Sequence, residues 1–182
     1  MANFSARKFM SRSLILLLLT YINTFFTCHG SSVLQSVCSQ TKDPSLCLAV
    51  LGSDSRSRSA RLAQLAQIAI DMAEYEAIGT KGKIHGLLMA AKDPKSKSLY
   101  ENCENMYLDA LAALGIAPDY LARRRYGDLG AQGVLVRDNV GRCGSLLLVV
   151  KPPFAKEIRE VEILGDSIAV ISQDLSRGRI VD

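Results

Sequence analysis

Four cysteines restrict what this chain can fold into more than any other feature. Cys38 and Cys47 enclose only eight residues, whereas Cys103 and Cys143 are far apart, each inside a stretch with a helical pattern. Four cysteines allow three pairings, and spacing does not choose among them, although sequential pairing is the simplest. Each disulfide would stabilise the fold by roughly 2 to 4 kcal/mol, because it restricts the unfolded chain.

The first thirty residues follow the pattern of a secretory signal peptide. Three basic residues precede an apolar run from Leu14 to Leu19, and small residues near Gly30 suit a cleavage site. The run is too short for a membrane span of about 20 residues, which makes an uncleaved anchor the weaker alternative. Cleavage also removes Cys28 and leaves an even number of cysteines, as a disulfide-bonded protein needs. We therefore expect a signal peptide at residues 1–30 and secretion of residues 31–182, with no membrane association afterwards.

Most of the net positive charge of the chain lies in this leader. The leader contains three of the 22 basic residues and none of the 18 acidic ones, so residues 31–182 are nearly neutral. Proteins that bind nucleic acids need a net basic surface. A nucleic-acid partner is therefore not expected.

The segment from Ser31 to Leu51 predicts a hairpin of two short helices. Asp43 can cap the second helix, and Pro44 suits its first position, where a missing N–H costs nothing. Such a hairpin is too small to bury its own apolar residues. It must therefore lie on the main body of the protein or on another molecule, and a polar linker from Gly52 to Ser59 follows it.

An amphipathic helix is predicted from about Leu62 to Ala91. Apolar residues recur there at spacings of three and four, with polar residues between them. Gly79, Gly82 and Gly86 interrupt this pattern, and each costs about 1 kcal/mol relative to alanine. Either the helix kinks there or it packs very closely against a neighbour.

The next helix is expected after a polar loop at residues 93–98. Ser98 and Glu101 form a capping-box pattern that places the start of the helix near Ser98. Gly115 is expected to end the helix, and Pro118 is expected to open a further short one.

The chain after Arg123 has the least regular pattern. We expect a helix from about 131 to 150, because a lone strand would have no partner in an otherwise helical chain. Pro152-Pro153 then breaks the chain, and a last amphipathic helix contains Ile158 to Leu175. Together the segments predict an all-α fold, an up-down-up-down four-helix bundle at 57–182 preceded by a helical hairpin at 31–56, within one domain at 31–182.

In combination, these residues resemble the plant invertase and pectin methylesterase inhibitors. The resemblance begins with a Cys-x-x-Thr-x-x-Pro-x-x-Cys pattern and includes a Cys-x-x-x-Tyr helix, a later cysteine and an apolar last helix. The matching residues are Cys38, Thr41, Pro44, Cys47, Asn102, Cys103, Tyr107, Leu111, Cys143, Ile168, Ala169 and Ile171. The resemblance implies bonds from Cys38 to Cys47 and from Cys103 to Cys143. It also implies a secreted inhibitor of a carbohydrate-active enzyme of the cell wall or vacuole.

The chain departs from this family pattern in two places. Invertase inhibitors resembling it insert a Pro-Lys-Phe loop before the fourth cysteine, where this chain has Arg125-Tyr126-Gly127-Asp128. A glycine-containing stretch, Leu129 to Arg142, also replaces the usual alanine-rich helix, and apolar residues, Leu146 to Val150, replace polar ones. The absent loop favours pectin methylesterase over acid invertase as the target.

The residues do not assemble a recognisable catalytic site. His85 is the one histidine after the leader, and it lies in a helical stretch without a visible catalytic partner. Gly144-Ser145 lacks the flanking glycine of a nucleophile elbow. With four cysteines in disulfides, no thiolate is left for nucleophilic or metal chemistry. We therefore expect a protein that is not an enzyme and holds neither a cofactor nor a metal.

Arg123, Arg124 and Arg125 form the densest run of charge, and with Tyr126 they are our candidate contacts for a partner. Their simpler interpretation is that they offset the negative end of the preceding helix by about 0.3 to 1 kcal/mol. The functional interpretation is steering toward an acidic enzyme surface or toward pectin.

Three further tyrosines could lie either in the core or at an interface. Tyr75, Tyr107 and Tyr120 lie in helical stretches and are interpreted as core or boundary residues. A tyrosine left exposed would instead be a candidate anchor for an interface.

The preferred functional hypothesis is a secreted, monomeric inhibitor that covers the substrate cleft of its target enzyme. Pectin methylesterase is the preferred target and acid invertase the alternative, in the apoplast and cell wall or in the vacuole. A different hypothesis is a bundle that carries an apolar ligand, which would require an apolar cavity at its centre. A third is an inhibitor-like scaffold whose inhibitory surface has been lost.

Overall fold

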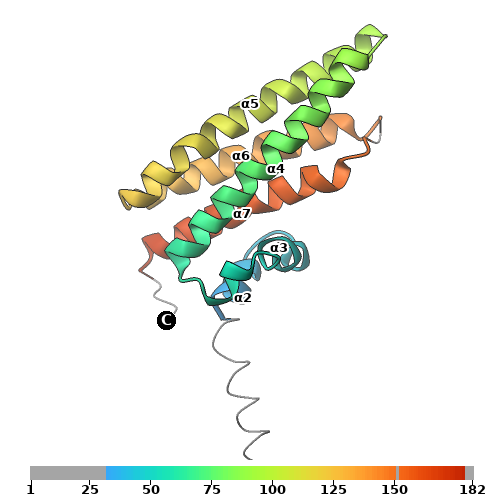
Figure 1. The fold of residues 1–182 in the computed structure, drawn as a ribbon. Coiled ribbons are helices and arrows are strands. Elements are labelled where there is room, and N and C mark those ends of the chain that lie inside the picture. Colours follow the sequence, from blue (N-terminus) through green and yellow to red (C-terminus); the bar gives the residue numbers. More distant parts are fainter. Residues whose placement is uncertain (1–31, 151, 179–182) are drawn as a thin grey trace, which may run out of the picture.

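The computed structural model describes residues 32–150 and 152–178, and every regular element in these ranges is helical. Two short helices, α2 (Ser32–Cys38) and α3 (Pro44–Leu51), are followed by a 3-10 helix, η1 (Ser55–Ser59). Four long helices follow, α4 (Leu62–Ala90), α5 (Pro94–Ala122), α6 (Tyr126–Leu147) and α7 (Ala155–Ser176). The long helices form a bundle in which each contacts two others, and α2 and α3 lie against α7 (Figure 1). The predicted all-α bundle with a preceding hairpin is confirmed.

The hairpin has the local structure that its sequence predicts. The Asp43 carboxylate accepts the Leu46 N–H at 3.0 Å, and Pro44 is the first residue of α3. Cys38 is bonded to Cys47, and both are almost fully buried between the hairpin and the bundle. The segment expected to be a polar linker contains the short helix η1. The predicted signal peptide at 1–30 lies outside the described residues.

The start of α5 differs from the prediction. The helix begins at Pro94 and not near Ser98, because Asp93 is its cap and accepts the Ser96 N–H at 2.8 Å. This hydrogen bond lowers the pKa of Asp93 below its usual value. Asp93-Pro94 is thus the helix start, with proline at a position that needs no N–H.

The end of α5 also differs from the prediction. The helix continues through Gly115 and Pro118 to Ala122, so the expected stop and the separate short helix were wrong. Leu114 and Ala117, which directly precede Gly115 and Pro118, are buried in the bundle. The packing of this face outweighs the hydrogen bond that proline removes.

The glycines of α4 do not pack against a neighbour. The helix is continuous from Leu62 to Ala90, and a Cβ on Gly79, Gly82 or Gly86 would meet no atom within 4 Å. The prediction of close packing at these residues was therefore wrong, because they lie on the outer face of the bundle.

Close packing is found instead where α6 meets α7. A Cβ on Gly133 would lie 2.8 Å from the carbonyl oxygen of Gly165, and a Cβ on Gly165 would lie 3.0 Å from that of Gly133. The first distance is shorter than real Cβ contacts allow and the second is at their limit, so the two helices approach through their bare backbones. The helix expected at about 131–150 runs from Tyr126 to Leu147, and Gly133 serves this contact, whereas Gly127 faces open space.

The centre of the bundle is filled with side chains from all four long helices. The largest fully buried ones include Leu65, Ile84, Tyr107, Leu114, Leu129, Leu147, Leu164 and Ile168. Burial raises the pKa of Tyr107 above its usual value. The Cys103–Cys143 bond, also fully buried, joins α5 to α6. None of the helices described is long and apolar enough to cross a membrane.

Candidate partner-binding surface

The arginine turn, residues Arg123 to Arg125, connects α5 to α6. Arg123 is the C-cap of α5, and its Nε lies 2.8 Å from the Asp119 carboxylate one turn earlier. The Nε of Arg125 lies 2.7 Å from Asp128, and this contact raises the pKa of Arg125. Two of the three arginines are therefore held by ion pairs with the helices that flank the turn.

Arg124 differs from its two neighbours in backbone and in charge pairing. Its φ of 56° lies in the left-handed region, which costs a residue with a side chain about 1 kcal/mol. It forms no ion pair with a residue in the ranges that the structure describes. The guanidinium of Arg124 is thus available at the tip of this turn.

Two tyrosines flank the arginine turn. The guanidinium of Arg125 lies 4.9 Å from the centre of the Tyr120 ring, a cation–π arrangement. Tyr126, the first residue of α6, is half-buried and lines a hollow of about 500 Å³ between α6 and α7. The turn combines cations, aromatic rings and a hollow, which are features of a surface that contacts a partner.

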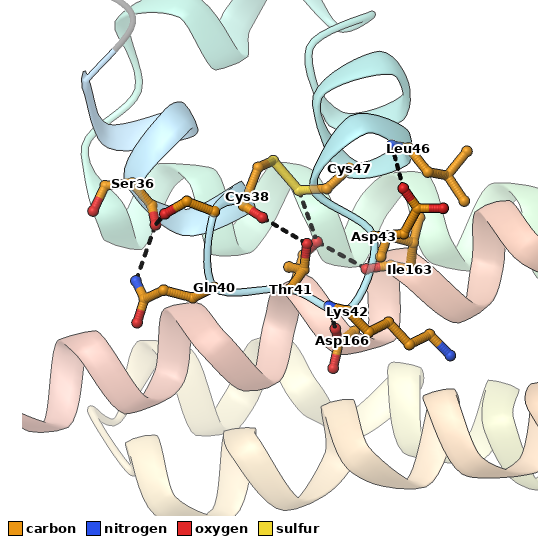
Figure 2. The surroundings of a disulfide bond; sticks show 12 residues. Ser36, Cys38, Gln40, Thr41, Lys42, Asp43, Leu46, Cys47, Ile163 and Asp166 are labelled. Atoms are coloured by element: carbon orange, nitrogen blue, oxygen red, sulfur yellow. Dashed lines mark hydrogen bonds between the residues drawn. A yellow bond between two sulfur atoms is a disulfide. The ribbon is translucent and has the colours of Figure 1, made fainter.

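The hairpin is positioned on α7 by polar contacts around its loop, as Figure 2 shows for Lys42. The Lys42 backbone N–H donates to Asp166 at 2.9 Å, and the Gln40 side chain donates to Asp174 at 2.8 Å. Asp166 also accepts from Arg137 of α6 at 3.2 Å. One buried carboxylate therefore joins the hairpin, α7 and α6.

Two ion pairs at the edge of the hairpin add to this attachment. The Lys42 ammonium contacts Glu162, and Arg159 lies 3.1 Å from Asp43. These contacts were not predicted from the sequence. A signal was present, because Asp166 and Asp174 are acidic residues between apolar positions of an amphipathic helix. Acidic residues are seldom buried unless they have a partner.

The other chemical groups considered from the sequence do not form a reactive site. His85 is exposed, and its Nδ1 lies 2.9 Å from Glu104 of α5. The Ser145 hydroxyl donates to the Gly141 carbonyl one turn earlier, at 3.0 Å. No group of acidic, histidine or cysteine side chains able to hold a metal is found in the described ranges.

The three tyrosines considered from the sequence lie in different environments. Tyr107 is fully buried and Tyr120 packs against the core, in agreement with their interpretation. Tyr75 is 77% exposed on the outer face of α4, so its assignment to the core or boundary was wrong. An exposed tyrosine is a candidate interface anchor.

These features define a disulfide-bonded helical bundle that offers surfaces for contact. A family model described as plant invertase/pectin methylesterase inhibitor matches residues 32–160. The chain belongs to the plant invertase/pectin methylesterase inhibitor family.

Three curated relatives illustrate how the match is distributed. A pectinesterase inhibitor from Actinidia deliciosa is 34% identical over 140 residues, which cover 76% of each chain. Pectinesterase inhibitor 1 from Arabidopsis thaliana is 31% identical over 123 residues, or 66% of this chain and 65% of the relative. A cell wall / vacuolar inhibitor of fructosidase 1 from Arabidopsis thaliana is 35% identical over 82 residues, or 45% of this chain and 39% of the relative.

Solved structures show the same fold. The crystal structure of a mutant form of a pectin methylesterase inhibitor from Arabidopsis superposes with a TM-score of 0.70, at 24% identity, and covers 79% of this chain and 97% of the other. A second crystal structure of a pectin methylesterase inhibitor, from Arabidopsis thaliana, gives a TM-score of 0.61 at the same identity. Helical bundles of this kind therefore persist although most side chains differ.

Proposed function

We propose that this protein is a secreted inhibitor of pectin methylesterase that covers the enzyme's substrate cleft. The observation that carries the proposal is the 34% identity to a pectinesterase inhibitor over 76% of both chains. The match to a fructosidase inhibitor covers 39% of that relative, which supports invertase as a target less strongly.

The mechanism we propose is steric. The bond between Cys103 and Cys143 joins α5 to α6, and the glycine contact joins α6 to α7. A helix face held in this way changes little on binding, so little conformational entropy is lost when it covers a groove. Catalytic side chains are not needed for such an activity.

The arginine turn and Tyr126 are the proposed contacts at one end of this surface. Arg124 is the principal cation, because Arg123 and Arg125 are already paired with acidic residues. A guanidinium without a partner attracts carboxylates on an approaching surface and increases the association rate.

Acid invertase is the second candidate target. The fructosidase inhibitor among the relatives supports it. Against it, the connection between α5 and α6 consists only of Arg123 to Arg125, and Tyr126 already belongs to α6. The Pro-Lys-Phe loop that invertase inhibitors are expected to insert has no counterpart there.

A carrier of apolar ligands receives less support. Buried side chains fill the middle of the bundle, including Leu65, Tyr107 and Leu164. A hollow of about 370 Å³ lined by Leu148 and Ile158 lies between α6 and α7, and it opens at the surface. A ligand carrier would instead enclose its ligand.

The test is to titrate the disulfide-bonded protein into pectin methylesterase and acid invertase separately, at pH 5 and pH 7. We expect stoichiometric loss of pectin methylesterase activity at micromolar inhibitor. Arg124→Ala should weaken inhibition about tenfold and reduce its dependence on salt, with Arg58→Ala as a control of equal charge on η1. Loss of neither enzyme activity would reject the inhibitor hypothesis for these enzymes.

A further inference from the structure

The outer face of α4 carries large apolar side chains that stay exposed in the part of the chain that the structure describes. Tyr75 is 77% exposed, Ile78 56% and Met89 73%. Their spacings of three and eleven residues place them on one side of the helix. In Figure 1, α4 crosses in front of α6 and α7, and no described helix lies over it beyond its first turns, where η1 contacts it. We call this surface, which contains Tyr75, Ile78 and Met89, the α4 face.

The same face contains open positions at regular intervals. Gly79, Gly82 and Gly86 leave the backbone bare, since a Cβ on any of them would meet nothing within 4 Å. Farther toward the start of the helix, Gln64, Gln67 and Ile68 line a hollow of about 420 Å³ next to η1. The face therefore alternates projecting side chains with places that can receive them.

Charge changes sign along this face. Glu74 lies in its first half and Lys81 in its second half, whereas Asp71 and Lys83 are already paired with Arg56 and Glu157. Glu74 and Lys81 form no ion pair with the described part of their own chain. Two copies in antiparallel orientation would place Glu74 of each near Lys81 of the other.

We propose that the α4 face binds a second copy of this chain, as a symmetric antiparallel dimer. The register is set by Tyr75 lying over Gly82 of the second copy. In an antiparallel pair the residue numbers of facing positions have a constant sum, so Ile78 then lies over Gly79. Two projecting side chains thus meet two bare positions, and symmetry repeats both contacts.

Two further contacts follow from this register without adjustment. Position 83 faces Glu74, so Lys81 of the second copy lies about 3 Å away along the axis, on the same edge of the helix. Met89 faces Ile68, whose side chain lines the hollow beside η1. The most exposed apolar side chain near the end of α4 therefore meets the hollow near its beginning.

The monomer expected from the sequence is replaced in this proposal by a weak dimer. A single helix face buries less surface than a standard interface, so we expect a Kd on the order of 10 to 100 μM. This self-association is independent of the proposed inhibition, since it involves neither the arginine turn nor a target enzyme.

The experiment is sedimentation equilibrium of the disulfide-bonded protein from about 5 to 500 μM. Wild type should pass from monomer to dimer over this range. Gly82→Leu should weaken association at least tenfold while the melting temperature stays equal or rises, because this position is open and leucine favours helix. Gly115→Leu on α5, an equally open glycine, is the matched control and should associate as wild type does.

A charge exchange tests the register itself. Glu74→Lys should weaken association about tenfold, since each dimer would contain two Lys–Lys contacts. Combining it with Lys81→Glu should restore the wild-type Kd to within about threefold. Failure of this double variant to recover would overturn the register.

Three other results would overturn the proposal. They are a monomer at 500 μM, a dimer that Gly82→Leu leaves intact, and loss of pectin methylesterase inhibition in Gly82→Leu without any self-association of wild type. The last result would assign the α4 face to the enzyme, whereas failure of wild type to inhibit any enzyme leaves the dimer test unaffected.

Discussion

Glycines occupy two helix faces of this protein, and the two faces have opposite surroundings. On α6 and α7, Gly133 and Gly165 are buried against each other's backbone at distances that exclude any side chain. On α4, Gly79, Gly82 and Gly86 point away from the bundle into open space. One group of glycines is therefore required by the fold, whereas the other weakens its own helix by about 1 kcal/mol each relative to alanine.

Glycine in a helix of this protein therefore has two separate physical roles. At the α6–α7 contact, it permits a short distance between helix axes and many backbone contacts. On α4 it contributes nothing to the monomer, so its presence calls for an explanation outside the monomer.

The largest effect is expected from the bond that holds α6 in place. The double variant Cys103→Ser/Cys143→Ser should lower the free energy of unfolding by about 2 to 4 kcal/mol, because the bond closes a long loop of the unfolded chain. Urea unfolding of both proteins measures the loss. Cys38→Ser/Cys47→Ser, which opens a much shorter loop, is the control and should cost less. An unchanged free energy of unfolding would contradict the stabilisation assigned to this bond.

The next effect distinguishes the two glycine faces directly. Gly133→Ala should destabilise the protein by about 2 kcal/mol, because its Cβ would meet backbone atoms of α7 that cannot move alone. Thermal and urea unfolding measure this change. A stability within about 0.3 kcal/mol of wild type would contradict the close contact.

The matched change on α4 should have the opposite sign. Gly82→Ala should stabilise the monomer by about 0.5 to 1 kcal/mol, since alanine favours helix and its Cβ enters open space. Unfolding at protein concentrations far below the dimer range isolates this effect. A loss of stability would show that the backbone at Gly82 is needed within the monomer.

The smallest effect concerns the ion pair between α4 and α7. Lys83 lies 2.5 Å from Glu157, and this contact holds the pKa of Glu157 below its usual value. The ion pair therefore stabilises the fold fully above the pKa of Glu157 in the unfolded chain. This stabilisation is lost as the pH falls through the lower pKa of Glu157 in the folded protein. Glu157→Gln should flatten the fall in melting temperature between pH 5 and pH 3 by about one degree. An identical pH dependence in the variant would argue against the pair.

Much of the fold follows from patterns that are local in the sequence. Spacings of three and four residues predicted α4, most of α5 and α7, whereas α6 was inferred because a lone strand would have no partner. Asp43-Pro44 correctly predicted the start of α3. The same cap chemistry at Asp93-Pro94 was assigned to a loop, because a capping-box pattern starting five residues later, at Ser98, competed with it. Gly115 and Pro118 were taken as a stop, and only the packing of their neighbours in the bundle carries α5 past them.

The candidate surfaces depended more strongly on tertiary structure. The arginine turn was evident as a run of charge, but its two ion pairs, and the lack of an ion pair between Arg124 and any described residue, emerge only from the folded chain. The carboxylate of Asp166 attaches the hairpin through contacts far apart in the sequence. No pattern within one helix reveals such a partner.

The helical class, the hairpin and the cysteines available for disulfides follow from the amino-acid sequence, because periodicity, caps and residue type are local patterns of a few residues. Which glycines are buried and which tyrosine is exposed depends on how the helices pack in the tertiary structure. The reason is that a helix periodicity defines an apolar side without saying which neighbour covers it. Gly133 and Gly82 are the same residue in the same kind of helix, and their roles differ only because α7 lies over one and nothing described lies over the other.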